Sequence, residues 1–148
     1  MWCWSGPSGS EKQANRIRDL GGDASALEVN VRSRKSLTKT LSRVIEEYGD
    51  LHCVLNGAGI GSLTPFFEIS TSEWNKMIDV LLTGTMLSCQ VFGNYFVEKE
   101  NGSVINISSL GCDTPLSQAY AYSAAKAGVS NLSKNLAREW ALFNVRVN

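Results

Sequence analysis

Short runs of apolar and β-branched residues alternate with longer segments of helical pattern along most of this 148-residue chain. Strands are predicted at residues 26–31, 52–56, 103–108 and 145–148. Helices are predicted at residues 11–20, 34–48, 70–96 and 120–143. Because strands that alternate with helices of these lengths form strand–helix–strand units, we predict an α/β fold built on a parallel sheet.

Several of the predicted helices carry recognisable signals. Gly21-Gly22 follows the first helix, and glycine is the usual residue just beyond a helix end. Ser70 and Glu73 have the spacing of a capping box, which predicts a helix start there. The helix over residues 34–48 is amphipathic, with one apolar stripe formed by Leu37, Leu41, Val44, Ile45 and Tyr48.

The first ten residues, MWCWSGPSGS, show neither helical nor strand periodicity. We therefore predict an irregular segment over residues 1–10 and one domain over residues 11–148. Two explanations of the segment stay open: the remnant of a truncated or mis-spliced start, which we favour, and a flexible arm.

Charge and composition narrow the classes of partner. The formal net charge is zero and no basic block is present, so nucleic acid is not expected as the main partner. No apolar run approaches the roughly 20 residues that span a bilayer, so no membrane segment is predicted. His52 is the only histidine, and we therefore expect neither a Ser–His–Asp arrangement nor a metal site.

The cysteines favour a reducing compartment. Cys3, Cys53, Cys89 and Cys112 form no Cys-x-x-Cys pair. The residues that follow Met1 lack the basic start and apolar stretch of a signal peptide. Reduced thiols and a cytoplasmic location are the expectation.

Tyr122 and Lys126 are the most informative pair of polar residues. Positions four apart lie on one face of a helix, so the phenol and the ammonium can reach the same small volume. A cation ~4 Å from a phenolate, at an effective dielectric constant of ~20, stabilises it by up to ~4 kcal/mol. Such stabilisation suits a phenol to proton transfer near neutral pH. A plain surface Tyr–Lys pair is the alternative reading of these two residues alone.

A hydroxyl group is predicted close to this pair. The strand over residues 103–108 runs into Ser109, thirteen residues before Tyr122. Open parallel sheets bind ligands at the carboxyl ends of their strands. Ser109, Tyr122 and Lys126 would together form a proton-transfer and oxyanion-stabilising set around one carbonyl oxygen.

These three residues, at this spacing, resemble the Ser…Tyr-x-x-x-Lys signature of the classical short-chain dehydrogenase/reductase family. The resemblance extends over residues 11–148 and implies an incomplete, doubly wound Rossmann-type sheet that binds NAD or NADP. It also implies the roles of the three residues. Tyr122 would be the general acid/base, Lys126 would assist the phenol and hold the nicotinamide ribose together with Tyr122, and Ser109 would orient the substrate oxygen.

Asn56, Gly57, Ala58 and Gly59 follow a predicted strand directly. A pyrophosphate-binding loop runs straight into a helix. Here the next predicted helix begins more than ten residues later, so we reject a pyrophosphate-binding role for these residues. A plain strand-to-loop turn remains possible. The family resemblance implies that these four residues line the adenosine side of the cofactor, with Gly57 replacing an asparagine.

Asn30 and Val31 are a second expected cofactor contact. The resemblance places them at the family's Asp-Val pair beside the adenine ring, where the Asn30 carbonyl oxygen can accept a hydrogen bond. Asn30 as an ordinary loop residue is equally compatible with the sequence.

The chain departs from the family pattern at two places. Leu81 occupies the position of an asparagine that helps to hold a proton-relay water. The glycine-rich Thr-Gly-x-x-x-Gly-x-Gly turn, which binds the pyrophosphate, has no match in residues 1–10. The expectation is an internal fragment that lacks this turn and the C-terminal substrate region, with an unpaired apolar sheet edge.

The resemblance implies an NAD(P)-dependent oxidoreductase that interconverts a secondary alcohol and a ketone. Runs such as 114–116 and 122–126 look most like members that act on sugar acids or polyols. A 3-oxoacyl thioester reductase and an inactive truncated chain that serves as an interaction module are the alternatives. A small-molecule substrate is expected, and the intact protein is expected to form a homo-oligomer.

Overall fold

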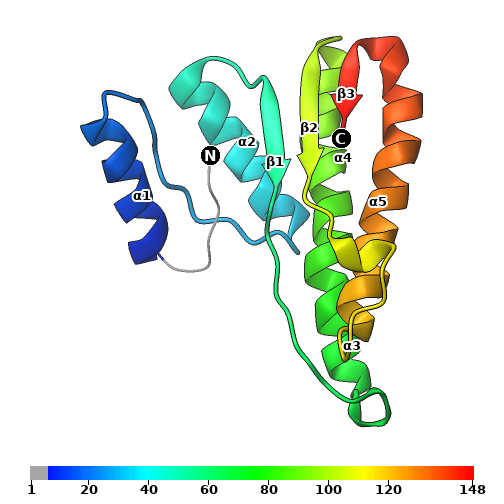
Figure 1. The fold of residues 1–148 in the computed structure, drawn as a ribbon. Coiled ribbons are helices and arrows are strands. Elements are labelled where there is room, and N and C mark those ends of the chain that lie inside the picture. The colour runs from blue at the N-terminus through cyan, green and yellow to red at the C-terminus, as the bar shows by residue number, and fades with distance from the viewer. Residues whose placement is uncertain (1–6) are drawn as a thin grey trace.

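The structure, a computed structural model, describes residues 7–148. Its centre is a three-stranded parallel sheet with the strand order β1-β2-β3 (Figure 1). The strands are β1 (Cys53–Asn56), β2 (Gly102–Asn106) and β3 (Val145–Val147). The predicted α/β fold with an incomplete parallel sheet is therefore confirmed.

Two long helices cover one face of this sheet. They are α4 (Gly84–Glu98) and α5 (Tyr120–Trp140), which run alongside each other behind β2 and β3 (Figure 1). Gly93 allows their close approach, because a β-carbon there would lie 2.2 Å from the Trp140 ring. Helix α2 (Arg34–Tyr48) packs against the other side of α4.

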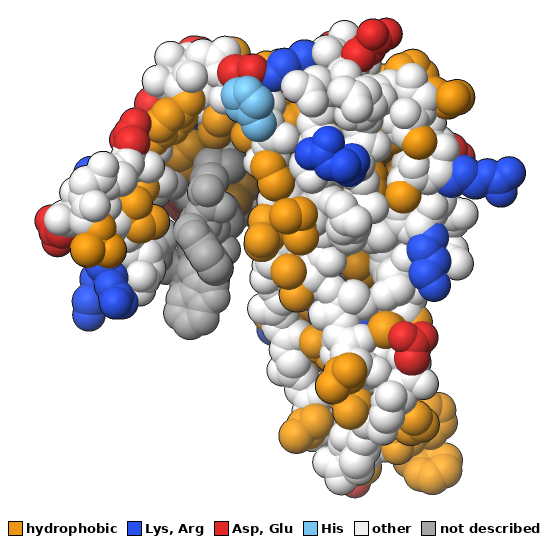
Figure 2. Space-filling view, turned by 45° about the horizontal axis from the view of Figure 1, so that its top comes forward, with side chains coloured by type: hydrophobic (Ala, Val, Ile, Leu, Met, Phe, Trp, Pro, Cys, Tyr) orange, Lys and Arg blue, Asp and Glu red, His pale blue; other side chains and the backbone are white. Residues whose placement is uncertain are grey.

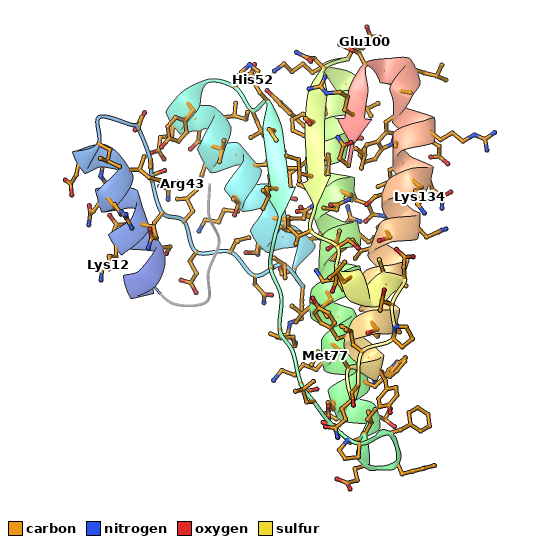
Figure 3. The ribbon with its side chains drawn as sticks, viewed as in Figure 1. Lys12, Arg43, His52, Met77, Glu100 and Lys134 are labelled. Carbon is orange, nitrogen blue, oxygen red and sulfur yellow. The ribbon has the colours of Figure 1, made fainter. Side chains whose placement is uncertain are left out.

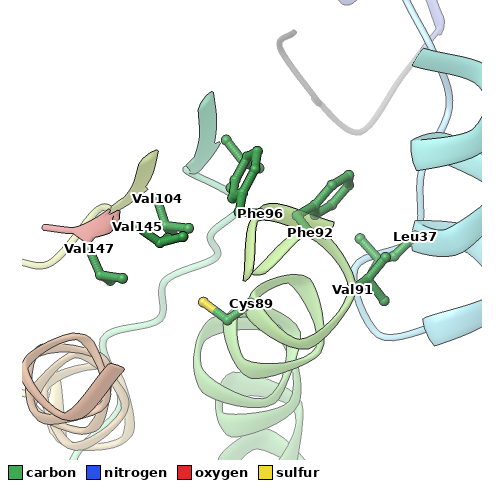
Figure 4. Close-up of a cluster of buried hydrophobic side chains, with 9 residues drawn as sticks. Leu37, Cys89, Val91, Phe92, Phe96, Val104, Val145 and Val147 are labelled. Atoms are coloured by element: carbon green, nitrogen blue, oxygen red, sulfur yellow. The ribbon is translucent and has the colours of Figure 1, made fainter. Parts of the chain in front are cut away.

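The core lies between the sheet and these helices. Alternate strand residues point to the same face, and here the large apolar residues of the inward set are Val54, Val104, Val145 and Val147. These valines meet Cys89, Phe92 and Phe96 of α4 (Figure 4). Leu55 and Ile107 point to the opposite face and are each 45% exposed, since α4 and α5 lie on the other side.

The predicted strand over residues 26–31 is wrong. Within the described part of the chain β1 pairs with β2 alone, and residues 26–31 form no strand. The stretch has the composition of a strand, but a strand needs a neighbour to complete its backbone hydrogen bonds. Among the described residues, β1 forms the predicted unpaired edge of the sheet.

The first helix begins earlier than predicted. Helix α1 spans Pro7–Asp19, so residues 7–10 are not irregular. Proline is favoured at the first helical position because its fixed φ suits the helix and its missing N–H needs no partner there. The expectation for residues 1–6 lies outside the described residues.

Helix α2 has the predicted bounds and clear caps. Its N-cap Ser33 accepts a hydrogen bond from the Ser36 amide at 3.2 Å. Gly49 ends the helix with φ of 77°, a conformation that favours glycine. Leu37 and Val44 of the predicted stripe are buried, whereas Tyr48 at the last turn is largely exposed.

One further helical run bears on the membrane prediction. Residues Thr71–Glu98, which comprise α3 (Thr71–Ile78), a π-helical turn (Asp79–Thr83) and α4, are long and apolar enough to cross a membrane by length and composition alone. In this structure 44% of the most apolar window is buried, and the core helix of a folded domain passes the same test of length and composition. The finding is weak evidence for a membrane span.

Candidate active site

Ser109, Tyr122 and Lys126 come from two adjoining elements. Ser109 follows β2 and precedes a 3-10 turn, Leu110–Cys112, which packs against the start of α5. The contact is close because Gly111 has no side chain: a β-carbon there would lie 3.0 Å from the Ser123 hydroxyl oxygen. Tyr122 and Lys126 lie one turn apart on α5, with the Lys126 nitrogen 5.8 Å from the Tyr122 ring centroid.

Lys126 is a buried cation with a defined contact. Its side chain is 6% exposed, and Nζ donates a hydrogen bond to the Ile107 carbonyl oxygen at 2.5 Å. Burial lowers the pKa of the Lys126 ammonium below its ordinary value, and the charge interaction with Tyr122 offsets part of that effect. The ammonium has three N–H donors, so it retains capacity for a further polar ligand.

The Ser109 hydroxyl is oriented by the turn that follows it. Its Oγ accepts a hydrogen bond from the Gly111 amide at 3.1 Å. Among the described residues its proton has no acceptor, and a serine hydroxyl can donate one hydrogen bond while it accepts others. Ser109 can therefore donate to an oxygen atom placed beside it.

Leu81 lies in the apolar cluster that Tyr122 packs against. It belongs to the π-helical turn and packs in a buried cluster with Met77, Ala121 and Ala125, with Tyr122 against the same cluster. Its carbonyl oxygen accepts a hydrogen bond from the Thr85 hydroxyl at 2.8 Å. The leucine side chain supplies apolar support for the phenol and no polar group.

The carboxyl ends of β1 and β2 are joined by a buried polar network. Asn56 donates to the Asn106 side-chain oxygen at 2.8 Å, and the two residues are register partners in the sheet. Ser88 of α4 donates to Asn56 at 2.5 Å, while Asn106 donates to Ser133 of α5 at 2.8 Å. The network thus links α4, β1, β2 and α5 in one chain of hydrogen bonds.

The sequence reasoning identified Asn56 but missed Asn106, Ser88 and Ser133. One signal was available: an asparagine at the end of each of two apolar strands places two amides side by side if the strands are paired in register. The serines carried no such signal, because the sequence of a helix does not show which of its hydroxyl side chains points into the protein.

Replacing Asn106 by alanine is expected to lower the free energy of unfolding by about 2–3 kcal/mol. The substitution removes the partner of the Asn56 amide in a buried site, and an unsatisfied buried polar group costs about 1–3 kcal/mol. Urea unfolding measures the change. Asn101→Ala, at an exposed position just before β2, is the matched control and should change little; an equal loss in the two variants would contradict the network's importance.

The residues expected on the adenosine side of the cofactor fall into two groups. Val31, Asn56, Gly57 and Ala58 line a cavity of about 690 Å³ between α1, α2 and the free edge of β1. Val31 also lies against α4, since a β-carbon on Gly84 would be 3.0 Å from it.

Asn30 and Gly59 stand outside the lining of this cavity. The Asn30 side-chain oxygen accepts a hydrogen bond from the Arg32 amide at 3.0 Å, which makes Asn30 a turn residue in this structure. Gly59 lies nearer the cluster that Tyr122 packs against, because a β-carbon there would be 3.4 Å from Leu81.

Glu73 connects the loop after Gly59 with α3. Its carboxylate accepts hydrogen bonds from the Ser62 hydroxyl at 2.5 Å and the Thr64 hydroxyl at 2.7 Å. Ser70 caps the Glu73 amide at 3.1 Å, so half of the predicted capping box is present. The other half is absent from the described bonds because the carboxylate binds the two loop hydroxyls instead.

The Glu73 contacts predict an acid-sensitive loop. The Ser62 and Thr64 hydroxyls hold the pKa of the Glu73 carboxyl below its ordinary value. Such a group stabilises the fold above its unfolded pKa of about 4.3, and this contribution is lost as the pH falls through the lower folded value. Glu73→Gln should therefore show a smaller loss of thermal stability between pH 7 and pH 3 than the parent chain. Glu139→Gln, at an exposed position, serves as the control; a loss in Glu73→Gln as large as in the parent chain would contradict this role.

His52 directly precedes β1 and lies at the amino end of the sheet (Figure 3), whereas Ser109 follows the carboxyl end of β2. Its Nε2 is 3.4 Å from Asp50, whose carboxylate also accepts hydrogen bonds from Tyr95, at 2.7 Å, and Lys99. Within residues 7–148 no three histidine, cysteine or carboxylate side chains gather as metal ligands would. His52 therefore belongs to a structural cluster at the amino end of β1.

The chain shares its sequence pattern with a known enzyme family. The sequence model of the family described as short chain dehydrogenase matches residues 2–148. A D-threitol dehydrogenase of Mycolicibacterium smegmatis is 36% identical over 132 residues, which is 87% of this chain and 51% of that protein. A 3beta-hydroxysteroid dehydrogenase 1 of Eggerthella lenta is 32% identical over 145 residues, 97% of this chain and 56% of that protein.

Solved structures agree with this assignment. A metagenomic short-chain oxidoreductase in complex with NADP matches with a TM-score of 0.92 and 25% identity, over 99% of this chain and 66% of that one. The chain spans little more than half the length of the two curated relatives. On the strength of the match over nearly its whole length, the chain belongs to the short-chain dehydrogenase family.

Proposed function

We propose that this chain carries the catalytic residues of an NAD(P)-dependent oxidoreductase that interconverts a secondary alcohol and a ketone. The observation that carries the proposal is the buried Lys126 ammonium beside the Tyr122 ring, next to the turn that orients Ser109. Burying a cation next to a phenol costs free energy of folding, because the charge loses its hydration. Such pairs are found at sites where a proton is transferred. Family membership supplies the reaction class.

Each of the three side chains has a role in moving or holding a proton. Tyr122 accepts the hydroxyl proton of the alcohol, or donates it to the ketone oxygen in the reverse direction. The Lys126 ammonium stabilises the phenolate that forms. Ser109 donates a hydrogen bond to the substrate oxygen, with the Gly111 amide fixing its orientation. A bound nicotinamide supplies the hydride acceptor or donor.

The residues present fit a nicotinamide cofactor on two counts. The Lys126 ammonium is held at the carboxyl end of β2 by the Ile107 carbonyl and keeps two N–H donors for ribose hydroxyls. The cavity at Asn56, Gly57 and Ala58 offers apolar walls and exposed backbone on the adenosine side. NAD and NADP are both compatible with this proposal.

Reduced-nicotinamide absorbance tests the reaction class. The purified chain, incubated with NAD or NADP and a secondary alcohol, should produce reduced cofactor only when protein, cofactor and alcohol are all present. D-threitol, a sugar acid and a 3-hydroxyacyl thioester represent the substrate classes expected from the sequence. A folded chain that produces no reduced cofactor with any alcohol would overturn the proposal.

A non-catalytic role is the second candidate. Leu81 replaces the relay asparagine of the family. Its side chain is buried in the apolar cluster that Tyr122 packs against. A chain with this role would bind a related subunit through α4 and α5 without binding NADH or NADPH. Size-exclusion chromatography with a related full-length subunit, with and without cofactor, separates the two candidates.

A further inference from the structure

The outer edge of β1 carries backbone groups that pair with no other strand. The Ser103 amide of β2 donates a hydrogen bond to the His52 carbonyl oxygen at 3.0 Å, which fixes the side of β1 that faces β2. Because successive strand residues direct their backbone groups to opposite sides, the N–H and C=O groups of Cys53 and Leu55 point away from β2. Within residues 7–148 β1 pairs with β2 alone, so the groups of these two residues have no strand partner.

This edge borders the cavity of about 690 Å³ described above, since Cys53 and Leu55 are among its lining residues. Much of the lining is apolar and includes Ile17 of α1, Leu37 and Val44 of α2, and Val29 and Val31 of the segment before α2. The space-filling view shows the molecule hollowed between α1 and the body of the protein, with hydrophobic side chains on both sides of the hollow (Figure 2). A molecule that fills this space must offer apolar groups as well as hydrogen-bond partners for the strand edge.

The charges around the cavity exclude an acidic occupant. Among the described lining residues Asp23 and Asp50 are the carboxylates, and no lysine or arginine is present. The Asp50 carboxylate already accepts hydrogen bonds from Tyr95 and Lys99. A carboxylate that entered the cavity would lose its hydration and find no cation among these residues.

An extended peptide meets all of these requirements. The outward groups of Cys53 and Leu55 repeat about every 6.6 Å, twice the rise of about 3.3 Å per residue in a parallel strand, and an extended chain repeats its donors and acceptors at the same spacing. Unpaired strand edges bind peptides in this way. Because α1 and α2 flank this edge, a single extended segment can reach it more readily than the sheet edge of a second folded copy.

We propose that β1 accepts an extended strand from another polypeptide, of about the length of its own four residues, without acidic residues and with apolar side chains toward the cavity walls. The added strand occupies the part of the cavity beside Cys53 and Leu55. It leaves residues 56–58, at the carboxyl end of β1, to the cofactor. The inference does not rest on the proposed function, because it concerns peptide binding and requires no turnover.

Hydrogen exchange at single amides tests the added strand. The probe is the peptide acetyl-Lys-Val-Thr-Val-Thr-Val-amide, and the exchange is followed by nuclear magnetic resonance of the 15N-labelled chain. The Cys53 and Leu55 amides should exchange fast without the peptide and about tenfold or more slowly at saturating peptide. The Val54 and Asn56 amides, which face β2, are the internal control and should be protected in both states.

A modified peptide separates strand pairing from binding by apolar side chains alone. The same peptide with N-methyl groups on two adjacent central residues keeps its side chains and lacks one donor on each edge. It should bind at least about tenfold more weakly than the unmodified peptide.

Leu55→Pro tests the same contact from the side of the protein. Proline removes one N–H from the outer edge and leaves the bonds to β2 in place, and edge strands accept proline where its nitrogen faces away from the sheet. Peptide binding should weaken at least about tenfold while the Val54 and Asn56 amides stay protected. Leu55→Val keeps the N–H, is the matched control and should bind as the parent chain does. If Leu55→Pro does not fold, the N-methylated peptide decides the question.

The inference would be overturned by unchanged exchange at Cys53 and Leu55 with the peptide, by equal binding of the two peptides, or by equal binding in a folded Leu55→Pro variant. Protection of both amides before any peptide is added would also overturn it, because the edge would then have another occupant. Sedimentation equilibrium identifies that occupant: a monomer would assign the edge to a segment of the same chain, and a dimer would assign it to a second copy.

Discussion

Tyr122→Phe is expected to lower the turnover of alcohol by about 10²–10⁴-fold, the usual contribution of a positioned general acid or base. The substitution removes one oxygen atom and keeps the ring that packs against the cluster around Leu81. Because the Tyr122 hydroxyl makes no hydrogen bond within the described residues, the stability of the fold should change little. The measurement is the initial rate of nicotinamide reduction, with the urea midpoint as the test of folding.

Tyr120→Phe provides the matched control for this prediction. Tyr120 lies two residues earlier on α5 and contacts Phe66 edge to face, with ring centroids 5.2 Å apart. It should keep the parent rate. Full activity in Tyr122→Phe, or an equal loss in both variants, would contradict the assignment of Tyr122 as the proton donor and acceptor.

Phe96→Ala is expected to lower the free energy of unfolding by about 3–5 kcal/mol, the range for truncation of a fully buried aromatic residue. Phe96 is 0% exposed and lies in the core between α4 and the sheet (Figure 4). Its ring lies against the Gly102 backbone, where a β-carbon would come within 2.3 Å. The alanine leaves a cavity that the rigid strand cannot close.

Phe67 is the control for this second prediction, because its side chain is 99% exposed. Phe67→Ala should change the free energy of unfolding by less than about 0.5 kcal/mol, as surface substitutions usually do. Urea unfolding followed by far-ultraviolet circular dichroism measures both variants. A loss below about 1 kcal/mol in Phe96→Ala would contradict the packing described for α4.

The sequence predicted those elements whose signals are local. Helix α2 has its apolar stripe, its N-terminal serine and its C-terminal glycine within seventeen residues, and its bounds agree with the prediction. Strands β1, β2 and β3 were predicted within one or two residues, because short β-branched runs between helices leave few alternatives in a parallel sheet.

Features that depend on distant parts of the chain were not predictable in this way. Residues 26–31 have the composition of a strand, yet pairing depends on a neighbour that composition does not reveal. The π-helical turn around Leu81 and the hydroxyl contacts of Glu73 depend on packing between segments far apart in the sequence. Ser88 and Ser133 became recognisable as site residues only once α4 and α5 were seen on the same side of β1 and β2.

The candidate catalytic residues were predicted from spacing and family resemblance together, and the structure adds their surroundings. Lys126 was expected next to the phenol; its hydrogen bond to the Ile107 carbonyl and its burial were not expected. Tyr122→Phe above tests the role proposed for Tyr122, and Lys126→Met below tests the role proposed for Lys126.

Cofactor binding by the purified chain tests the central claim most directly. NADH and NADPH are titrated separately and followed by cofactor fluorescence, with circular dichroism to establish folding. We expect saturable binding of one or both cofactors, at least about tenfold weaker in Lys126→Met because a charged ribose contact is lost. Lys134→Met, at an exposed lysine on the same helix (Figure 3), should bind as the parent chain does. A folded chain that binds neither cofactor, or a Lys126→Met variant that binds as well as the parent, would contradict the account.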